Sequence, residues 1–176
     1  MLTLDKHDAT FVNLNTRIER HGDERELAAD IKLSLRAQNT ILDQLEPGLR
    51  KDIFRKPSRG EQPDIPEIGG DQLVAVKHPS IEPLRLSHEF EGYEIEIAGL
   101  MDHVEPLLLV DVKLKKFVVA PLEGGSVELT FTASTNVGQD EVSELCEAFV
   151  REDVRLTVTP PKRQAQGDPE DSREAA

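Results

Sequence analysis

The sequence predicts an α+β fold: a mainly antiparallel, twisted sheet or a partly closed OB-like barrel, built from two strand-turn-strand-helix units. Two segments near the ends of the chain alternate apolar and polar residues around a glycine turn, and a helical pattern follows each of them. The spacing is similar, because about nineteen residues separate Gly22 from Ile41 and about eighteen separate Gly124 from Val142. Structural repetition and chance likeness of a common motif both remain open.

The first unit begins with alternating segments at residues 10–20 and 27–36, which predict two half-buried strands joined at Gly22. Asn39 is expected to cap a short helix through Leu45. Pro47 and Gly48 interrupt this helix before a further turn that carries Leu49, Ile53 and Phe54.

The second unit has β-rich segments at 107–119 and 127–133 around the turn 123–125. Asp140 is expected to cap the helix that follows. Its apolar positions recur with helical spacing and predict one buried stripe, on which Cys146 is a small core residue. The stripe consists of Val142, Leu145, Cys146, Phe149 and Val150. A closing strand at 154–158 ends before Pro160.

The rest of the chain completes one predicted domain, residues 1–161, because the length suits one core. Residues 55–72 read as a long exposed loop. Residues 73–76, 84–86 and 93–97 predict further short strands, and residues 162–176 predict a disordered acidic tail.

The charge and the cysteine content restrict the class of protein. The net charge of -13 disfavours a general nucleic-acid coat unless basic groups cluster on one face. The sequence has neither a long apolar segment nor a signal-peptide pattern, which predicts a soluble, cytoplasmic protein without membrane contact. The single cysteine excludes an intramolecular disulfide.

No catalytic signature is present, so the sequence favours a protein that is not an enzyme and uses no cofactor. The five histidines lack the spacing of metal ligands, and no metal site is predicted. Asp102, Asp111 and Lys113 loosely match the two acids and one lysine of a Mg²⁺-dependent nuclease. Such triplets are frequent by chance, and the alternative interpretation is the solvated face of an amphipathic strand, with Lys113 and Lys115 beside Asp111.

The outer face of the first hairpin is the candidate nucleic-acid-binding surface, because amide and guanidinium groups bind phosphates and bases and an aromatic ring stacks on a base. Its predicted residues are Phe11, Asn13, Asn15, Arg17, Lys32 and Arg36. The alternative is that an antiparallel sheet simply shows a polar face to water.

The segments "VNLNTRIERHGDERELAADIKLSL" and "VDVKLKKFVVAPLEGGSVELTF" resemble small proteins that tailed bacteriophages encode among genes for recombination and DNA replication. The layout of "AADIKLSLRAQNTILDQL" followed much later by "GDPEDSREAA" is also similar to that of phage single-stranded DNA-binding proteins, which have an OB-like barrel and an acidic tail that recruits partner proteins. This resemblance implies a non-enzymatic accessory protein that binds single-stranded DNA and replication or recombination proteins in the host cytoplasm.

The same resemblance implies that the tail binds the protein partner, through Asp168, Glu170, Asp171 and Glu174. The tail departs from the family pattern, since it ends in two alanines without a terminal aromatic residue. The alternative function is an acidic nucleic-acid mimic that inhibits a host defence or DNA-processing enzyme, with Glu94 and Glu96 spaced roughly as phosphates along one strand face. The sequence does not fix the oligomeric state and is compatible with a homodimer.

Overall fold

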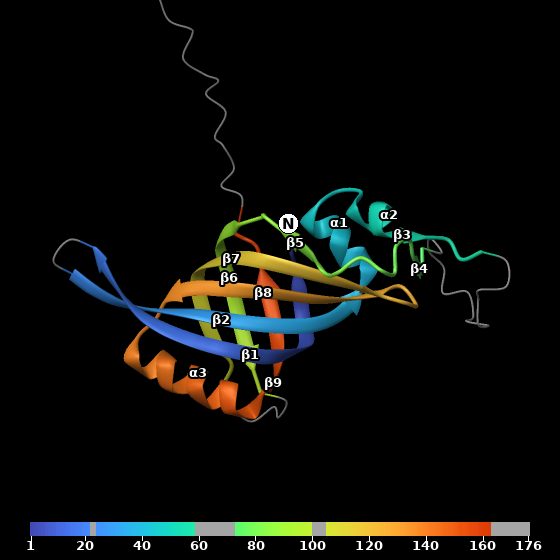
Figure 1. Cartoon of the computed structure of the whole chain (residues 1–176). Helices are drawn as coiled ribbons and strands as arrows, with labels where there is room; N and C mark the ends of the chain where they lie inside the picture. Colours follow the sequence, from blue (N-terminus) through green and yellow to red (C-terminus); the bar gives the residue numbers. More distant parts are fainter. Residues whose placement is uncertain (22–23, 59–72, 100–104, 163–176) are drawn as a thin grey trace, which may run out of the picture.

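The fold is a closed barrel of six long antiparallel strands (Figure 1). The computed structural model describes residues 1–21, 24–58, 73–99 and 105–162. Neighbouring strands around the barrel follow the order β7-β6-β9-β1-β2-β8, and a β7–β8 pairing closes the ring. The strands are β1 (Leu4–His21), β2 (Glu24–Gln38), β6 (Phe90–Ala98), β7 (Leu107–Leu122), β8 (Ser126–Asn136) and β9 (Asp153–Thr159).

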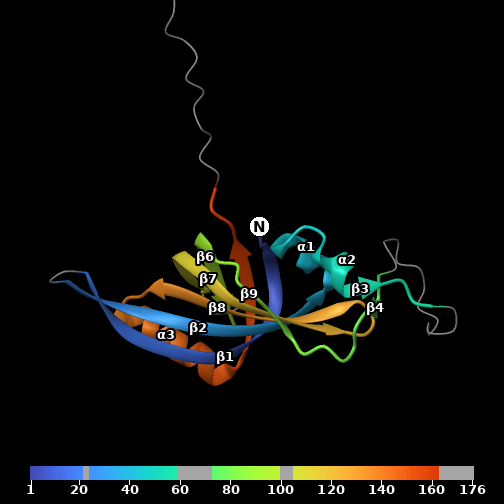
Figure 2. The ribbon, with the colours of Figure 1, turned by 45° about the horizontal axis from the view of Figure 1, so that its top comes forward.

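Short elements complete the described chain. The helical ones are η1 (Asn39–Ile41), α1 (Leu42–Leu45), α2 (Leu49–Ile53) and α3 (Gln139–Arg151). The short strands are β3 (Phe54–Arg55), β4 (Ala75–Val76) and β5 (Leu84–Leu86), of which β5 extends the sheet beside β7. Figures 1 and 2 show α3 against one end of the barrel and α1 and α2 near the other. Within the described ranges, no helix combines the length and apolar character needed to cross a membrane.

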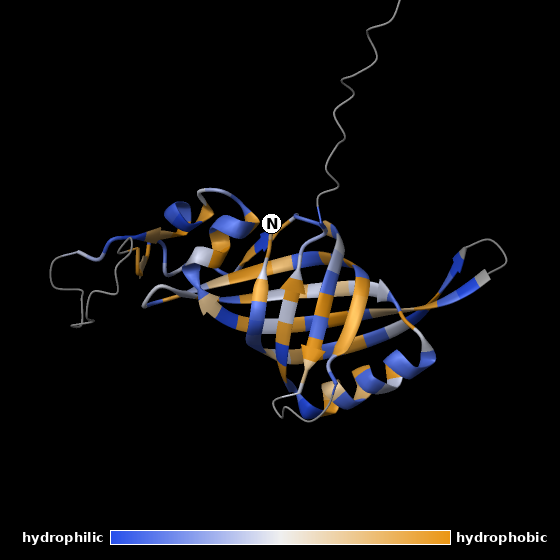
Figure 3. Ribbon diagram, turned by 180° about the vertical axis from the view of Figure 1, so that it is seen from behind, coloured by the Kyte–Doolittle hydropathy of each residue, from blue (hydrophilic) through white to orange (hydrophobic). Residues whose placement is uncertain are grey.

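The barrel interior is filled by side chains from alternate strand positions. Buried and exposed residues alternate along β2 and β8, and the hydropathy bands of Figure 3 follow the same period. Phe117 and Phe131 lie at the centre, fully buried, with ring centroids 5.7 Å apart. A barrel of this strand number has room for little else than its own side chains. Any binding surface must therefore lie outside the barrel or at its ends.

Bulges bend the long strands enough to close the sheet. The pairing register shifts at five places, and three non-glycine residues with positive φ lie at or beside such shifts: Lys6, Asp111 and Lys116. An extra residue in one strand increases the local twist. One of the irregularities in β7 carries Lys116, with φ of 58°, beside the outward-facing Lys115.

Helix α3 covers its end of the barrel with a narrower stripe than the sequence predicts. Leu145 is fully buried, but Val150 is 81% exposed and Cys146 is also exposed, so the prediction of Cys146 as a core residue is wrong. A helix that crosses the end of a barrel buries only the side that faces the sheet. The helix begins at Gln139, and the carboxylate of Glu141 accepts a hydrogen bond from the backbone N–H of Gly138. The N-cap is Gly138, two residues before the predicted cap Asp140.

At the other end of the barrel, Asn39 does not act as the predicted helix cap. Its side chain is buried, and its Nδ2 donates a hydrogen bond to the carbonyl oxygen of Leu73 at 2.6 Å. The Asn39 backbone N–H donates to the carbonyl of Gly125 in the β7–β8 turn. Asn39 thus joins the end of β2 to two distant segments. The interruption at Pro47 and Gly48 is confirmed, since α1 ends at Leu45 and α2 begins at Leu49.

The antiparallel barrel agrees with the OB-like architecture expected from the sequence, and each predicted strand lies within or overlaps an observed one. The α+β description and the duplication of one unit are not confirmed. The hairpins β1–β2 and β7–β8 do pair, through β2 and β8, but a 13-residue helix follows one and two helices of four and five residues follow the other. Residues 59–72 of the predicted loop and 163–176 of the predicted tail lie outside the described residues.

Candidate nucleic-acid interface

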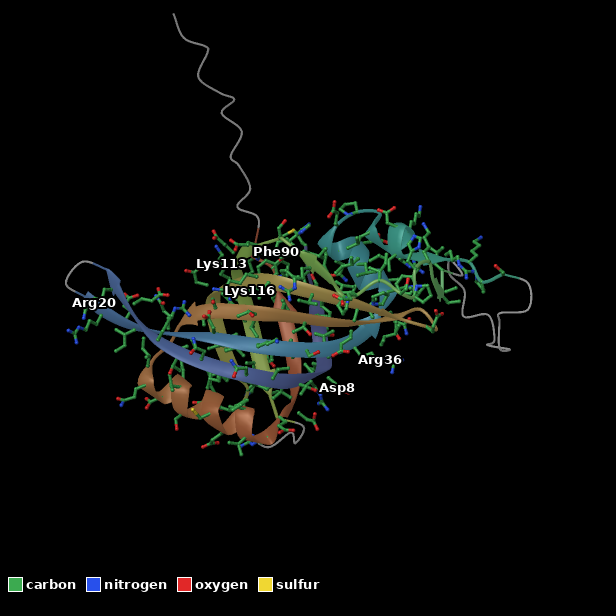
Figure 4. All side chains as sticks on the ribbon, viewed as in Figure 1. Asp8, Arg20, Arg36, Phe90, Lys113 and Lys116 are labelled. Atoms are coloured by element: carbon green, nitrogen blue, oxygen red, sulfur yellow. The ribbon has the colours of Figure 1, made fainter. Side chains whose placement is uncertain are left out.

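One polar surface extends over four neighbouring strands of the barrel, β1, β2, β8 and β7. Their outward-facing side chains carry cations, amides and hydroxyls, a set that we call the polar outer face, and the carboxylates of Asp30 and Glu128 lie among them. It comprises Asn13, Asn15, Arg17, Lys32, Ser34, Arg36, Lys113, Lys115, Thr130, Thr132 and Ser134. Figure 4 views this side of the barrel, with Arg36 near one end of β2 and Lys113 and Lys116 over β7.

The strand register aligns a row of side chains across the middle of this face. Lys32 pairs with Asn13 on one side and with Thr132 on the other, and Thr132 pairs in turn with Lys115. Neighbouring strands lie about 4.8 Å apart, so the two lysine backbones are separated by about 10 Å. Lys32 is exposed and makes no ion pair with any described residue. The centre of the row therefore offers an unneutralised ammonium group beside a hydroxyl and an amide.

Asp30 neutralises part of this positive charge. Its carboxylate lies 2.6 Å from Arg17 Nη1 and 3.3 Å from Lys115 Nζ, and it accepts a hydrogen bond from the Ser134 hydroxyl. Burial by itself would raise the pKa of Asp30, but the hydrogen bonds from Ser134 and Arg17 and the charge of Lys115 outweigh burial and lower the pKa. Asp30 is thus ionised at neutral pH and holds Arg17 and Lys115 in place.

Arg36 marks the far end of the face. It pairs in register with Glu128 and donates from Nη2 to the Ser126 hydroxyl at 3.1 Å. Arg17 lies far from Arg36, because the register pairs Arg17 with Ala28. Eight residues of β2 separate Ala28 from Arg36, roughly 27 Å along an extended strand. The two arginines therefore lie at opposite ends of the face and do not form one cluster.

Phe11 is not part of the face. It is 1% exposed and packs against Phe149 of α3, with ring centroids 5.6 Å apart. A bulge between Phe11 and Asn13 changes which side chains point outward, and this places Phe11 toward the core. The ring lies on the core side of β1, opposite the polar outer face, so it cannot take the stacking role expected for it there.

The residues of the nuclease-like alternative are only partly described. Asp102 lies outside the described residues. Lys113 makes ion pairs with Glu89 at 2.6 Å and Glu91 at 3.1 Å, and the hydrogen bond that its ammonium group donates to Glu89 is the main reason that the pKa of Lys113 is raised. In the described part of the chain, no three His, Cys, Asp or Glu side chains are grouped closely enough to hold a metal ion. The nuclease interpretation therefore gains no support and stays a hypothesis.

Charge is distributed unevenly around the barrel. The sequences of β2, β7 and β8 together contain six basic and five acidic residues, whereas those of β6, β9 and α3 contain two and eight. An anion approaching this acidic protein meets least repulsion over β2, β8 and β7. These three strands are nearly neutral, so they lack the negative excess of β6, β9 and α3 but do not form a strongly basic cluster.

The structure brings five of the six predicted residues to one surface, in a register that the sequence did not give: Asn13, Asn15, Arg17, Lys32 and Arg36. The sequence interpretation missed the contribution of Lys115 and of the β8 hydroxyls. The alternation in 113–119 and 127–133 signalled that these side chains face outward, but nothing in it showed that β8 lies between β2 and β7. The predicted partner-binding residues Asp168, Glu170, Asp171 and Glu174 lie outside the described residues.

Comparison with protein-family models, with curated proteins and with solved structures finds no match to this chain.

Proposed function

We propose that the protein is a non-enzymatic accessory of bacteriophage DNA recombination or replication, which binds single-stranded DNA in the host cytoplasm and contacts proteins of the same process. The observation that carries this proposal is the row Lys115–Thr132–Lys32–Asn13 on the polar outer face. It lies where basic residues are not outnumbered by acidic ones. Ammonium, hydroxyl and amide groups are the usual donors to phosphate oxygens.

Binding on this face would be directed at the DNA backbone. Lys32 would contact phosphate directly, while Lys115 and Arg17 would share their charge with Asp30. Phe11 is buried, and no other aromatic residue belongs to the polar outer face as defined from the described strands. Since base stacking contributes about 1–3 kcal/mol per base, its absence implies weak binding that tolerates any sequence.

The test is fluorescence anisotropy of a labelled oligonucleotide over a series of salt concentrations. Wild-type protein should bind at low salt, and its affinity should fall steeply as salt rises. Lys32→Ala should lower the affinity several-fold and reduce the salt slope by about one, because one phosphate contact is lost. Lys115→Ala should have a smaller effect, since Asp30 already balances Lys115.

Arg151→Ala is the matched control, because Arg151 is a half-exposed cation on α3, away from the face. It should leave the affinity nearly unchanged. Absence of any anisotropy change at low salt, or an equal loss for Lys32→Ala and Arg151→Ala, would reject this function.

A second candidate is an acidic protein that occupies the nucleic-acid site of a host enzyme. The excess of eight acidic over two basic residues on β6, β9 and α3 favours it. Glu94 and Glu96 lie on the same side of β6, roughly 7 Å apart. Recovery of one stoichiometric host nuclease with wild-type protein, but not with Glu94→Gln/Glu96→Gln, would favour inhibition, provided that the protein shows no DNA affinity.

A further inference from the structure

The β1–β2 hairpin continues beyond the barrel (Figures 1 and 2). The pairing of β2 with β8 ends at Ala28 and that of β1 with β9 ends at Thr10, whereas β1 and β2 remain paired from Arg17–Ala28 to the end of the hairpin. Among the described residues, the distal half of β1 therefore has a strand on one side only. A two-stranded ribbon is marginally stable in water, and its open edge is a template for another strand.

The distal half of β1 also exposes an apolar side chain. Ile18 is 65% exposed, although its side chain lies on the side of the ribbon that faces the core within the barrel. Its cross-strand neighbour Leu27 is only partly buried against the core. Further along the ribbon, the pairs are like-charged, because Glu19 lies opposite Glu26 and Arg20 lies opposite Arg25. Like charges directly opposite one another destabilise a strand pair.

We propose that this open edge of β1 binds the same edge of a second copy of the chain, antiparallel and centred on Ile18. In this register Ile18 lies against its symmetry mate, and Arg17 lies opposite Glu19 of the other copy on both sides of the axis. Within one copy, Arg17 Nη2 and Glu19 Oε1 are already 2.5 Å apart. Pairing would thus assemble a network of four alternating charges beside the like-charged Glu19–Glu26 pair.

The sequence of the edge selects this register over its neighbours. A shift of one residue would set the apolar side of one strand against the polar side of the other. A shift of two residues would place Arg17 opposite Arg17 or Glu19 opposite Glu19, depending on its direction. Only the register centred on Ile18 combines opposite charges with an apolar contact at the axis.

The resulting dimer has the isologous symmetry expected of a homodimer. Its four-stranded sheet has the order β2-β1-β1-β2 and leaves the polar outer faces of both copies on the same side. The strand contact is short, so the buried area falls below that of a standard stable interface, and association should depend on concentration in the micromolar range. This proposal does not depend on DNA binding.

The experiment combines light scattering with disulfide trapping. Wild-type protein should shift from 19.6 kDa toward twice this mass as its concentration rises. Ile18→Asp should remain monomeric, because it would place two carboxylates at the axis, and the high exposure of Ile18 means that the monomer fold is retained. Val150→Asp is the matched control, because Val150 is 81% exposed on α3. This variant should dimerise as wild type does.

The register is tested separately. Glu19→Arg should weaken association at least tenfold. Glu26→Arg is the control, because it makes the same charge change at the position opposite Glu19, on β2 and away from the partner. This control variant should associate as wild type does. In a Cys146→Ser background, Ile18→Cys should form a disulfide dimer under mild oxidation. Directly opposed residues have Cα atoms about 4.5–5.5 Å apart, within disulfide range.

Two results would overturn the proposal. One is a wild-type mass that stays monomeric up to the highest soluble concentration, with no more disulfide dimer from Ile18→Cys than from Val150→Cys in the same background. The other is a dimer that Ile18→Asp leaves intact, which would place the interface elsewhere on the molecule.

Discussion

Arg17 Nη1 lies 2.6 Å from Asp30 Oδ2 across the β1–β2 ladder, and the two side chains are 35% and 23% exposed. Ser134 and Lys115 contact the same carboxylate, so Asp30 connects β1, β2, β8 and β7 on one face of the barrel. A partly buried carboxylate with three partners should matter for stability as well as for the charge of the surface.

The first prediction concerns pH. The pKa of Asp30 is lowered in the folded protein, so its contribution to the free energy of unfolding is present above its unfolded pKa, near 3.9, and is lost as the pH falls through the lower folded value. Asp30→Asn should cost about 1–2 kcal/mol at pH 7, and the difference from wild type should shrink below about pH 4. Urea unfolding at several pH values measures this difference. Asp5→Asn, at an exposed carboxylate, should cost little, and a pH-independent loss for Asp30→Asn would contradict the ionic explanation.

The second prediction separates a core role of Phe11 from a binding role. Phe11 is 1% exposed and Phe149 is 38% exposed, although their rings touch. Phe11→Leu should lower the free energy of unfolding by about 1 kcal/mol, more than Phe149→Leu does, and should not change oligonucleotide affinity. Chemical denaturation and anisotropy measure the two effects. If Phe11→Leu lowered the affinity without lowering the stability, Phe11 would contribute to binding and not to the core.

The third prediction uses the two glycines of the β7–β8 turn as a matched pair. Gly124 and Gly125 have φ values of 87° and 80°, so alanine at either position is strained by about 1–2 kcal/mol. A Cβ on Gly124 would meet nothing within 4 Å, but a Cβ on Gly125 would lie 3.1 Å from Val74 Cγ1. Gly125→Ala should therefore lower the melting temperature more than Gly124→Ala. Equal losses would show that the turn and the segment at Val74 are not packed together in solution.

The fourth prediction concerns the only cysteine of the chain. Cys146 lies on the exposed side of α3, so one thiol per chain should react with a water-soluble disulfide reagent in the native state. The reaction should go to completion at a rate close to that of the unfolded protein. Protection until denaturant is added would mean that this side of α3 is covered in solution, as the sequence pattern had suggested.

Local patterns in the sequence predicted much of the fold. Period-two alternation identified β1, β2 and β8, the glycine pair identified the β7–β8 turn, and Pro47-Gly48 identified the break between α1 and α2. These features depend on residues close in the chain, where the spacing of apolar side chains reflects directly which face is buried. Caps at Asn39 and Asp140 were predicted wrongly, because the Asn39 side chain donates to a distant backbone carbonyl instead, and because α3 has its N-cap at Gly138, whose N–H is bound by Glu141.

The sequence by itself determined that this is a strand-rich, acidic protein whose first hairpin carries amides and cations on one side and apolar residues on the other. Only the tertiary structure decided that the sheet closes into a barrel and that β8 lies between β2 and β7, which places Thr132 between Lys32 and Lys115. It also decided that Phe11 is covered and that Ile18 is exposed. The physical reason is that bulges and pairing between distant strands set which side chains share a face, and alternation within one strand carries no information about its neighbours.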